Sequence, residues 1–219
     1  MSEIVKERPI LFNGPMVRAI LEGRKTQTRR IIGSKKKPVD IFIQDTQFID
    51  GKEQSLGFED ENGGWFDTEE MCPYGHKGDR LWVRETHHLS HHNALTYRAD
   101  YNHNPFDEEE CGEDCSMVGE KWRPSIHMPR WASRIDLEIT NIRVERLREV
   151  SPEDAYCEGV TREMRNGFGY ACDESEEIFN MHQSKETFRF LWESIHGEGS
   201  WDANPWVWVI EFKRVESTQ

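Results

Sequence analysis

The apolar and polar residues change their spacing several times along the chain, and each regular stretch predicts an element. Apolar residues alternate with polar ones at Ile135, Leu137 and Ile139, which is the spacing of a half-buried strand, and Ile142 and Val144 extend the pattern past a bend. Residues that favour strands are also concentrated in four other short segments, namely 8–12, 28–32, 80–85 and 206–212. The chain therefore alternates predicted strands with connecting pieces of very different length.

Three helices are predicted from apolar residues at helical spacing and from signals at their ends. The first follows residues 13–15, where a capping asparagine precedes a proline, and it ends at Gly23. The second begins at 151–154, which combines a capping serine, a proline and an acid three residues after the cap, and it carries Glu158. The third is predicted to begin at Ser184. Its apolar stripe consists of Phe188, Leu191, Trp192 and Ile195.

Strands separated by short and long irregular pieces, with few helices, predict an α+β fold built on a small mixed β-barrel. Two stretches, roughly 33–77 and 86–122, show little periodicity, and we interpret them as insertions into that fold. A chain of 219 residues lies within the size range of one domain, and no internal repeat or domain boundary is visible. We therefore expect a single domain over 1–219.

Composition narrows the classes of protein that the chain can belong to. The charged fraction of 32% and the mean hydropathy of -0.82 indicate a globular protein with much exposed polar loop. No apolar run has the length of a membrane span and the first residues lack the apolar core of a secretion signal, so we expect a cytoplasmic protein without membrane contact. Five cysteines without an export signal favour reduced thiols over a disulfide framework.

The formal charge of -13 argues against a protein that coats DNA or RNA non-specifically, because long-range attraction to phosphate needs positive potential. The charge is nevertheless unevenly distributed. Seven Lys or Arg residues and no acid lie between Arg24 and Lys37. This asymmetry permits a local anion-binding face on an acidic protein.

The first candidate for chemistry is the pair Lys25 and Thr28, three residues apart in the turn after Gly23. A turn can bring an amine and a hydroxyl together, whereas a strand points residues three apart to opposite faces. Threonine needs a base to act as a nucleophile, and a lysine serves as that base only when burial or neighbouring cations lower its pKa. The neighbouring cations are Arg24, Arg29 and Arg30, which can also hold a phosphate or a developing oxyanion. Spacing alone favours the plainer interpretation, a solvated basic turn.

Two further groups of residues have alternative interpretations. Trp82, Arg84 and Trp131 belong to stretches that mix aromatic and basic residues, which suits stacking on nucleobases and contact with phosphate, but equally suits tryptophans in a core that arginines cover. Four residues have the types of zinc ligands, but their spacing is wider than that of ordinary structural zinc pairs, so we expect neither a metal nor another cofactor. These residues are Cys72, His76, Cys111 and Cys115.

The residues at 23–29, Gly-Arg-Lys-Thr-Gln-Thr-Arg, together with Gly78-Asp79 before a strand and the closing strand at 207–213, resemble the ASCH superfamily. Residues 8–12, 72–75 and 122–129 also resemble longer ASCH proteins of phage and prophage genomes, so the resemblance covers nearly the whole chain. It implies a PUA-like β-barrel. The two insertions distinguish this chain from the compact members of the superfamily and can reshape or cover a pocket.

Within that superfamily, the loop at 23–28 is similar to that of the small bacterial amidohydrolases that deacetylate N4-acetylcytidine. Their signature is Gly-Arg-Lys-Thr-x-Thr and a glutamate on a later helix, which Glu158 matches. The resemblance implies that Thr28 attacks the acetyl carbonyl, that Lys25 activates it and that Glu158 completes the triad. It also implies a modified nucleoside or RNA as the partner. Two other hypotheses remain: an RNA-binding module without turnover, and an ASCH-type ribonuclease in which the same cations stabilise a transferring phosphate.

Overall fold

The computed structural model describes residues 5–33, 38–42, 57–60, 65–67, 71–89, 94–101, 121–161, 164 and 181–215. At 38–42, 57–60, 65–67 and 181–182 the structure describes the backbone only. The helices of the described part are α1 (Gly14–Leu21), α3 (Pro152–Cys157) and α5 (Met181–His196). The strands are β1 (Glu7–Leu11), β2 (Gln27–Ile31), β3 (Pro38–Phe42), β4 (Gly57–Asp60), β5 (Trp65–Asp67), β6 (Arg80–Arg84), β7 (His87–Leu89), β8 (Leu95–Tyr97), β9 (Asp136–Arg146) and β10 (Trp206–Val215).

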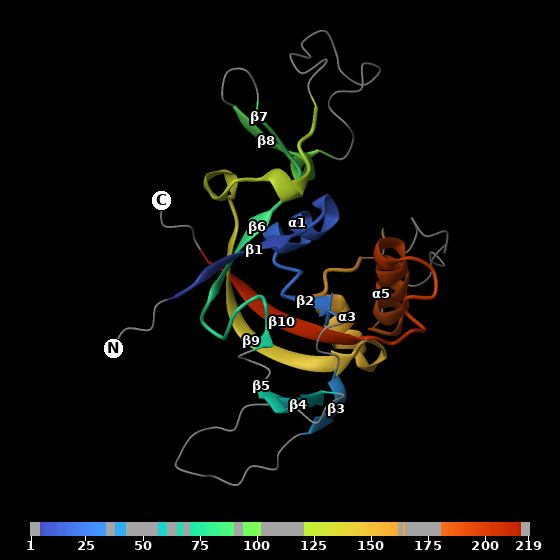
Figure 1. Ribbon diagram of the computed structural model, residues 1–219. Helices are drawn as coiled ribbons and strands as arrows, with labels where there is room; N and C mark the ends of the chain where they lie inside the picture. Colours follow the sequence, from blue (N-terminus) through green and yellow to red (C-terminus); the bar gives the residue numbers. More distant parts are fainter. Residues whose placement is uncertain are drawn as a thin grey trace.

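The main sheet has the strand order β1-β6-β9-β10-β2, in which only β1 and β6 run parallel. Its longest strands, β9 and β10, curve together across the centre of the molecule (Figure 1). The fold is therefore α+β with a mixed sheet, as the sequence predicts. The predicted closure into a barrel is not observed in the described part of the chain, because β1 and β2 form two open edges of the sheet.

The two predicted insertions contribute small sheets of their own. The stretch 33–77 contains the antiparallel sheet β3-β4-β5, and 86–122 contains the hairpin β7-β8. Both lie outside the sheet order of the five main strands. No helix among the described residues has the length and apolar character needed to cross a membrane.

Local sequence signals explain where most main elements begin and bend. The Asn13 side chain accepts a hydrogen bond from the Met16 amide at the start of α1, and Gly23 has a left-handed backbone after its end. The predicted bend in β9 coincides with a register shift against β10 between Glu211 and Phe212. Because of this extra residue, the apolar residues before and after the bend stay on one face of the sheet.

One predicted boundary is wrong, because α5 begins at Met181 and Ser184 lies inside the helix. The Ser184 hydroxyl donates to the carbonyl oxygen of Pro152 in α3, at 2.7 Å, and so it joins two helices. Ile195, predicted to belong to the apolar stripe, is 47% exposed. The remaining members of that stripe are buried, as predicted: Phe188, Leu191 and Trp192.

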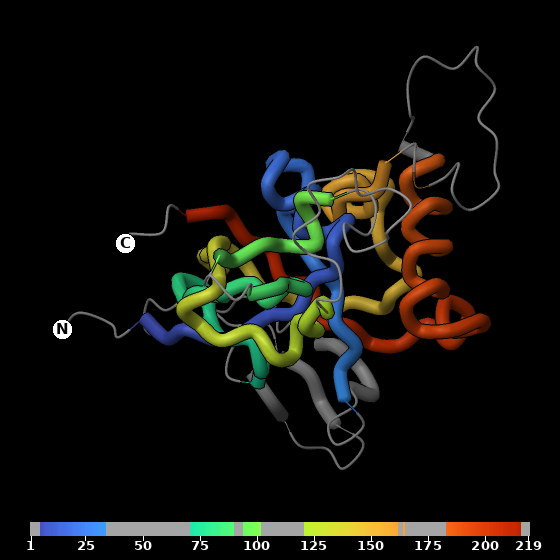
Figure 2. Tube along the Cα trace, turned by 90° about the horizontal axis from the view of Figure 1, so that it is seen from above, coloured from blue at the N-terminus to red at the C-terminus, as the bar shows by residue number. Residues whose placement is uncertain are grey.

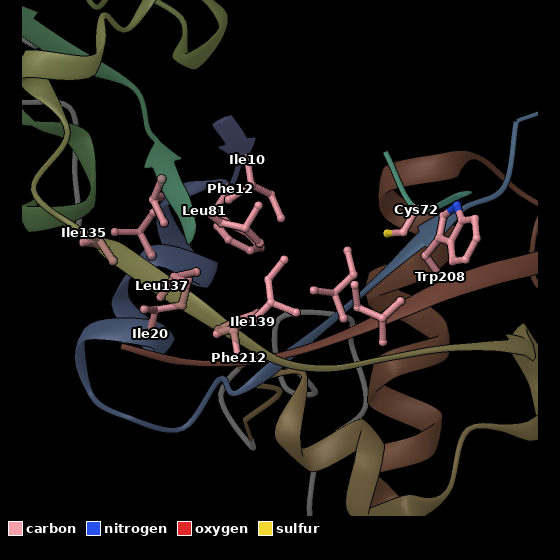
Figure 3. Close-up of a cluster of buried hydrophobic side chains, with 14 of the residues drawn as sticks. Ile10, Phe12, Ile20, Cys72, Leu81, Ile135, Leu137, Ile139, Trp208 and Phe212 are labelled. Atoms are coloured by element: carbon pink, nitrogen blue, oxygen red, sulfur yellow. The ribbon is translucent and has the colours of Figure 1, made fainter. Parts of the chain in front are cut away.

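The two faces of the main sheet carry separate hydrophobic clusters. The first cluster includes Ile10, Leu81, Ile139 and Phe212 and packs against α1 (Figure 3). The second lies under α3 and α5 and includes Val207 and Val209 of β10 together with Leu147, Val150, Ala155, Val160, Phe188, Leu191, Trp192 and Trp201. In Figure 2, α3 lies between α1 and α5. The edge strand β2 therefore belongs to a sheet that is packed on both faces. Helix α3 lies on the face that carries the second cluster.

Candidate functional site

Lys25 lies in the turn between α1 and β2, where the chain is held against the last part of the helix. The backbone amides of Arg24 and Lys25 both donate to the carbonyl oxygen of Ala19, at 2.9 and 3.0 Å. The left-handed backbone of Gly23 permits this reversal. The turn directs the lysine inward, so that its side chain is 0% exposed.

The Lys25 ammonium group meets Glu158, which follows α3 as its C-terminal cap. Lys25 Nζ donates to Glu158 Oε2 at 2.7 Å and to the Glu158 carbonyl oxygen at 2.9 Å. The Glu158 side chain is 3% exposed. The structure thus joins two of the three predicted catalytic residues in a buried, hydrogen-bonded ion pair.

Gly159 allows the two segments to come this close. A Cβ atom on this residue would lie 2.8 Å from Ala19 Cβ and 2.9 Å from Lys25 Cβ, and its φ of +86° is left-handed. Glycine alone satisfies both requirements without strain. Gly159 is a residue that sequence reasoning missed as part of the site, although a glycine directly after the predicted glutamate is the signal that marks it.

Thr28 lies within β2 and is 2% exposed. It is paired with Ile210 of β10, a member of the first hydrophobic cluster, so its side chain points to that face of the sheet. Lys25 Nζ reaches the same face, 5.6 Å from the centroid of the Phe12 ring. Among the described residues no hydrogen bond joins the Thr28 hydroxyl to Lys25 or Glu158. The amine and the hydroxyl share a face, and Lys25 makes its hydrogen bonds to Glu158.

Arg30 alternates with Thr28 along β2 and also points to the face of the first cluster. Its guanidinium carbon lies 5.2 Å from the centroid of the Phe12 ring, and Nη2 donates to the carbonyl oxygen of Leu11 at 2.6 Å. The Arg30 Nε atom is buried and has no hydrogen-bond partner in the described structure. Arg30 therefore keeps a buried donor that an oxygen of a ligand can satisfy.

The environment of Lys25 lowers the pKa of its amine from the ordinary value of 10.5. Burial is the largest cause, because it disfavours the charged form of the amine. The Glu158 carboxylate raises the pKa of Lys25, whereas the Arg30 and Arg29 cations lower it further. A lysine with a lowered pKa has a larger neutral fraction near neutral pH. Such an amine can accept a proton from a hydroxyl.

Arg29 points to the opposite face of the sheet from Thr28, toward α3 and α5. Its side chain is 0% exposed and it forms ion pairs with three carboxylates: Glu158 Oε1 at 3.1 Å, Asp154 Oδ2 at 3.0 Å and Glu145 Oε2 at 3.2 Å. The guanidinium also lies 5.8 Å from the centroid of the Phe188 ring. The structure therefore places this predicted substrate-binding residue in contact with the glutamate of the site.

The remaining predicted substrate-binding residues lie in two places. Arg24 Nη1 donates to the carbonyl oxygen of Gly159 at 3.0 Å, which puts Arg24 beside the ion pair. Trp82 and Arg84 alternate in β6 with buried apolar residues of the first cluster, so they point to the other face of the sheet. Arg84 stacks on Trp82, with 5.4 Å between the guanidinium carbon and the ring centroid. Trp131 is 69% exposed in a short 3-10 turn. The structure does not gather these three residues around Lys25.

The residues considered as zinc ligands are only partly described. Cys72 is buried in the first hydrophobic cluster, and burial raises the pKa of its thiol to about 11. His76 Nδ1 lies 3.4 Å from Asp79 Oδ2. Cys111 and Cys115 lie outside the described residues. Within the described ranges, no group of three or more His, Cys, Asp or Glu residues is arranged to hold a metal ion.

Comparisons of this chain with protein-family models, with curated proteins and with solved structures found no match. Evidence on function therefore comes from the motifs of the sequence and from the contacts of Lys25, Thr28 and Glu158.

Proposed function

We propose that this chain is an amide hydrolase of the ASCH superfamily that acts on an acylated pyrimidine nucleoside such as N4-acetylcytidine. The observation that carries the proposal is the buried ion pair between Lys25 and Glu158, two residues 133 positions apart that the sequence motifs single out together. A PUA-like fold is part of the same proposal, and the bent pair of long strands, β9 and β10, supports it.

Formation of the acyl-enzyme is the first half of the proposed reaction. The neutral amine of Lys25 accepts the proton of the Thr28 hydroxyl as the Thr28 oxygen attacks the amide carbonyl carbon. Negative charge develops on the carbonyl oxygen, and the Arg30 guanidinium stabilises it. The carbon–nitrogen bond then breaks, and the leaving amino group of the pyrimidine takes the proton from the Lys25 ammonium.

Hydrolysis of the acyl-enzyme completes the cycle. A water molecule attacks the ester carbon and gives a proton to Lys25, and the ester bond breaks so that Thr28 regains its hydroxyl proton. The products are the free nucleoside and the carboxylic acid. Throughout, the Glu158 carboxylate orients the Lys25 amine and stabilises its charged form, the role of the third member in other nucleophile–base–acid triads.

The direct test is to incubate the purified protein with N4-acetylcytidine and to follow cytidine by chromatography. We expect product from the parent protein, a loss of at least about 1,000-fold for Thr28→Ala, and a loss of about 100- to 10,000-fold for Lys25→Met. Thr28→Ser keeps the hydroxyl and is expected to keep measurable turnover. Lys213→Met, a change at a lysine whose side chain is 58% exposed, is the matched control for the lysine substitution. No product from the parent protein would reject this substrate, and full turnover by Thr28→Ala would reject the nucleophile.

RNA binding without turnover is the second candidate, and the exposed Trp131 favours it. An exposed indole can stack on a base, and its neighbour Arg130, ion-paired with Glu7 at 3.0 Å, provides a cation beside it. Labelled single-stranded RNA, followed by mobility shift across a salt series, tests this candidate and reveals any cleavage. We expect Trp131→Ala to weaken binding roughly 10- to 100-fold if the tryptophan stacks on one base. Equal affinity of the two proteins would exclude Trp131 from the contact.

A further inference from the structure

The buried Arg29 guanidinium links the Glu158 carboxylate to the rest of α3 and to the main sheet. We infer that Arg29 is a positioning residue, which fixes the Glu158 carboxylate in the orientation that Lys25 requires. This inference rests on the proposed function for its consequence in catalysis.

The two oxygens of the Glu158 carboxylate have different partners. Oε2 accepts from Lys25 Nζ at 2.7 Å, and Oε1 accepts from Arg29 Nη1 at 3.1 Å. A carboxylate held at both oxygens cannot rotate about its terminal bond without breaking one of these bonds. Arg29 therefore fixes the orientation of the carboxylate plane relative to Lys25.

The far side of the Arg29 guanidinium is itself anchored. Its Nη2 atom contacts Asp154 Oδ2 at 3.0 Å and Glu145 Oε2 at 3.2 Å. Asp154 lies four residues before Glu158, and Gln27 Nε2 donates to the Asp154 carbonyl oxygen at 2.6 Å. The planar fork of an arginine holds two sets of carboxylates in a fixed geometry in this way, whereas the ammonium group of a lysine is a compact charge without that fork.

Arg143 provides a natural comparison within the same cluster. It contacts Asp154 Oδ2 at 3.0 Å and also forms ion pairs with Glu145 and Glu211. In the part of the chain that the structure describes, none of the ion pairs of Arg143 involves Glu158. A substitution of Arg143 therefore disturbs the charge cluster without removing the bond to the glutamate of the site.

The charged groups that act on Lys25 are Glu158 from the end of α3, and Arg29 and Arg30 from β2. Removal of Arg29 takes away a cation that lowers the pKa of Lys25. The loss of this cation favours the charged ammonium, so it raises the pKa of Lys25 and reduces the neutral fraction that is needed as a base.

The test is a titration of the Lys25 side chain by NMR in protein carrying lysine labelled with carbon-13 at Cε, with the resonance assigned by its absence in Lys25→Met. We expect Arg29→Met to raise the Lys25 pKa above the parent value and Arg143→Met to leave it unchanged. In the hydrolysis assay, the rising limb of the pH–kcat profile is expected to move to higher pH in Arg29→Met only. Equal Lys25 pKa values in the parent protein and in the Arg29 variant would overturn the inference.

Arg29→Lys replaces Arg29→Met if the methionine variant does not fold. Because a lysine lacks the fork that spans Glu158 and Asp154, we expect the pKa of Lys25 still to rise, by a smaller amount, whereas Arg143→Lys leaves it unchanged. The same Lys25 pKa in Arg29→Lys and in Arg143→Lys would overturn the inference. The titration needs no substrate, so a parent protein without hydrolase activity would reject the proposed function and leave the role of Arg29 to be decided by NMR.

Discussion

Lys25 and Glu158 form a buried ion pair in which the ammonium nitrogen and the carboxylate oxygen are 2.7 Å apart. Both side chains are almost fully removed from solvent, at 0% and 3% exposure. Removal of two charges from water costs as much as their attraction returns, so a buried pair of this kind is a poor means of stabilising a fold. The pair is consistent with the proposed role of Lys25 and Glu158 in positioning and proton transfer.

The first prediction concerns the energetic coupling of this pair. Lys25→Met leaves the Glu158 carboxylate buried without its lysine, and we expect a loss of about 3–5 kcal/mol in the free energy of unfolding. The double variant Lys25→Met/Glu158→Leu removes both charges and is expected to lose less than the sum of the two single variants. Urea unfolding of the four proteins measures this, with Lys213→Met as the exposed control. Strict additivity would show that the two residues are not coupled.

The second prediction follows from the lowered pKa of Lys25. Between its folded pKa and the ordinary value of 10.5, the unfolded chain binds more protons at this residue than the folded chain does. Stability at this site therefore rises with pH across that interval. We expect the difference in unfolding free energy between the parent protein and Lys25→Met to grow as the pH is raised toward 10. A difference that stays constant or shrinks over this range would contradict the pKa shift.

The third prediction separates two effects of a glycine. Gly159 and Gly197 both have left-handed backbones, with φ of +86° and +92°, but a Cβ at Gly159 would clash with Ala19 and Lys25 whereas one at Gly197 would meet nothing within 4 Å. We expect Gly197→Ala to cost about 1–2 kcal/mol, from backbone strain alone. Gly159→Ala is expected to cost about 1–3 kcal/mol more, from overpacking. Similar thermal unfolding temperatures for the two variants would show that the close approach at Gly159 is not needed.

The fourth prediction concerns Asp79, which follows the turn before β6. Burial raises the pKa of this carboxyl, but hydrogen bonds from the Lys6 amide, the Arg8 side chain and His76 outweigh it and bring the pKa to about 2, below its ordinary value of 3.8. The ionised Asp79 carboxylate therefore stabilises the folded protein at pH values above the ordinary pKa, and this stabilisation is lost as the pH falls through about 2. We expect Asp79→Asn to lose about 2 kcal/mol at pH 7 and to differ much less from the parent protein at pH 2. Unfolding in urea at both pH values measures this difference. An equal loss of stability at both pH values would disprove the ionic origin of the Asp79 contribution.

Elements whose formation depends on residues close together in the sequence were predictable from it. The strands β1, β2, β6, β9 and β10 follow local strand-forming residues, and the capping serine of α3, Ser151, accepts a hydrogen bond from the Asp154 amide as its position predicts. The start of α5 was not predictable in this way, because Ser184 uses its hydroxyl to contact Pro152 in another helix. Closure of the sheet depends on the relative position of β1 and β2, which no local pattern specifies.

The candidate site was predictable only in part, for the same reason. Spacing identified Lys25 and Thr28 as neighbours in sequence, but only the family resemblance connected them with Glu158. The ion pairs of Arg29 were not predicted, because its partners Asp154 and Glu145 are distant in sequence. The alternation of a strand offers a signal that could have found it: if Thr28 points to one face of β2, Arg29 points to the other and needs a carboxylate there.

In the proposed reaction, the Thr28 oxygen becomes covalently acylated during turnover of an acylated nucleoside. Intact-protein mass spectrometry of the protein, quenched in acid soon after mixing with N4-acetylcytidine, tests it most directly. We expect a species heavier by one acetyl group in the parent protein, located on Thr28 after proteolysis, and no such species in Thr28→Ala. Release of cytidine at the parental rate by Thr28→Ala, or the same added acetyl group on that variant, would contradict it.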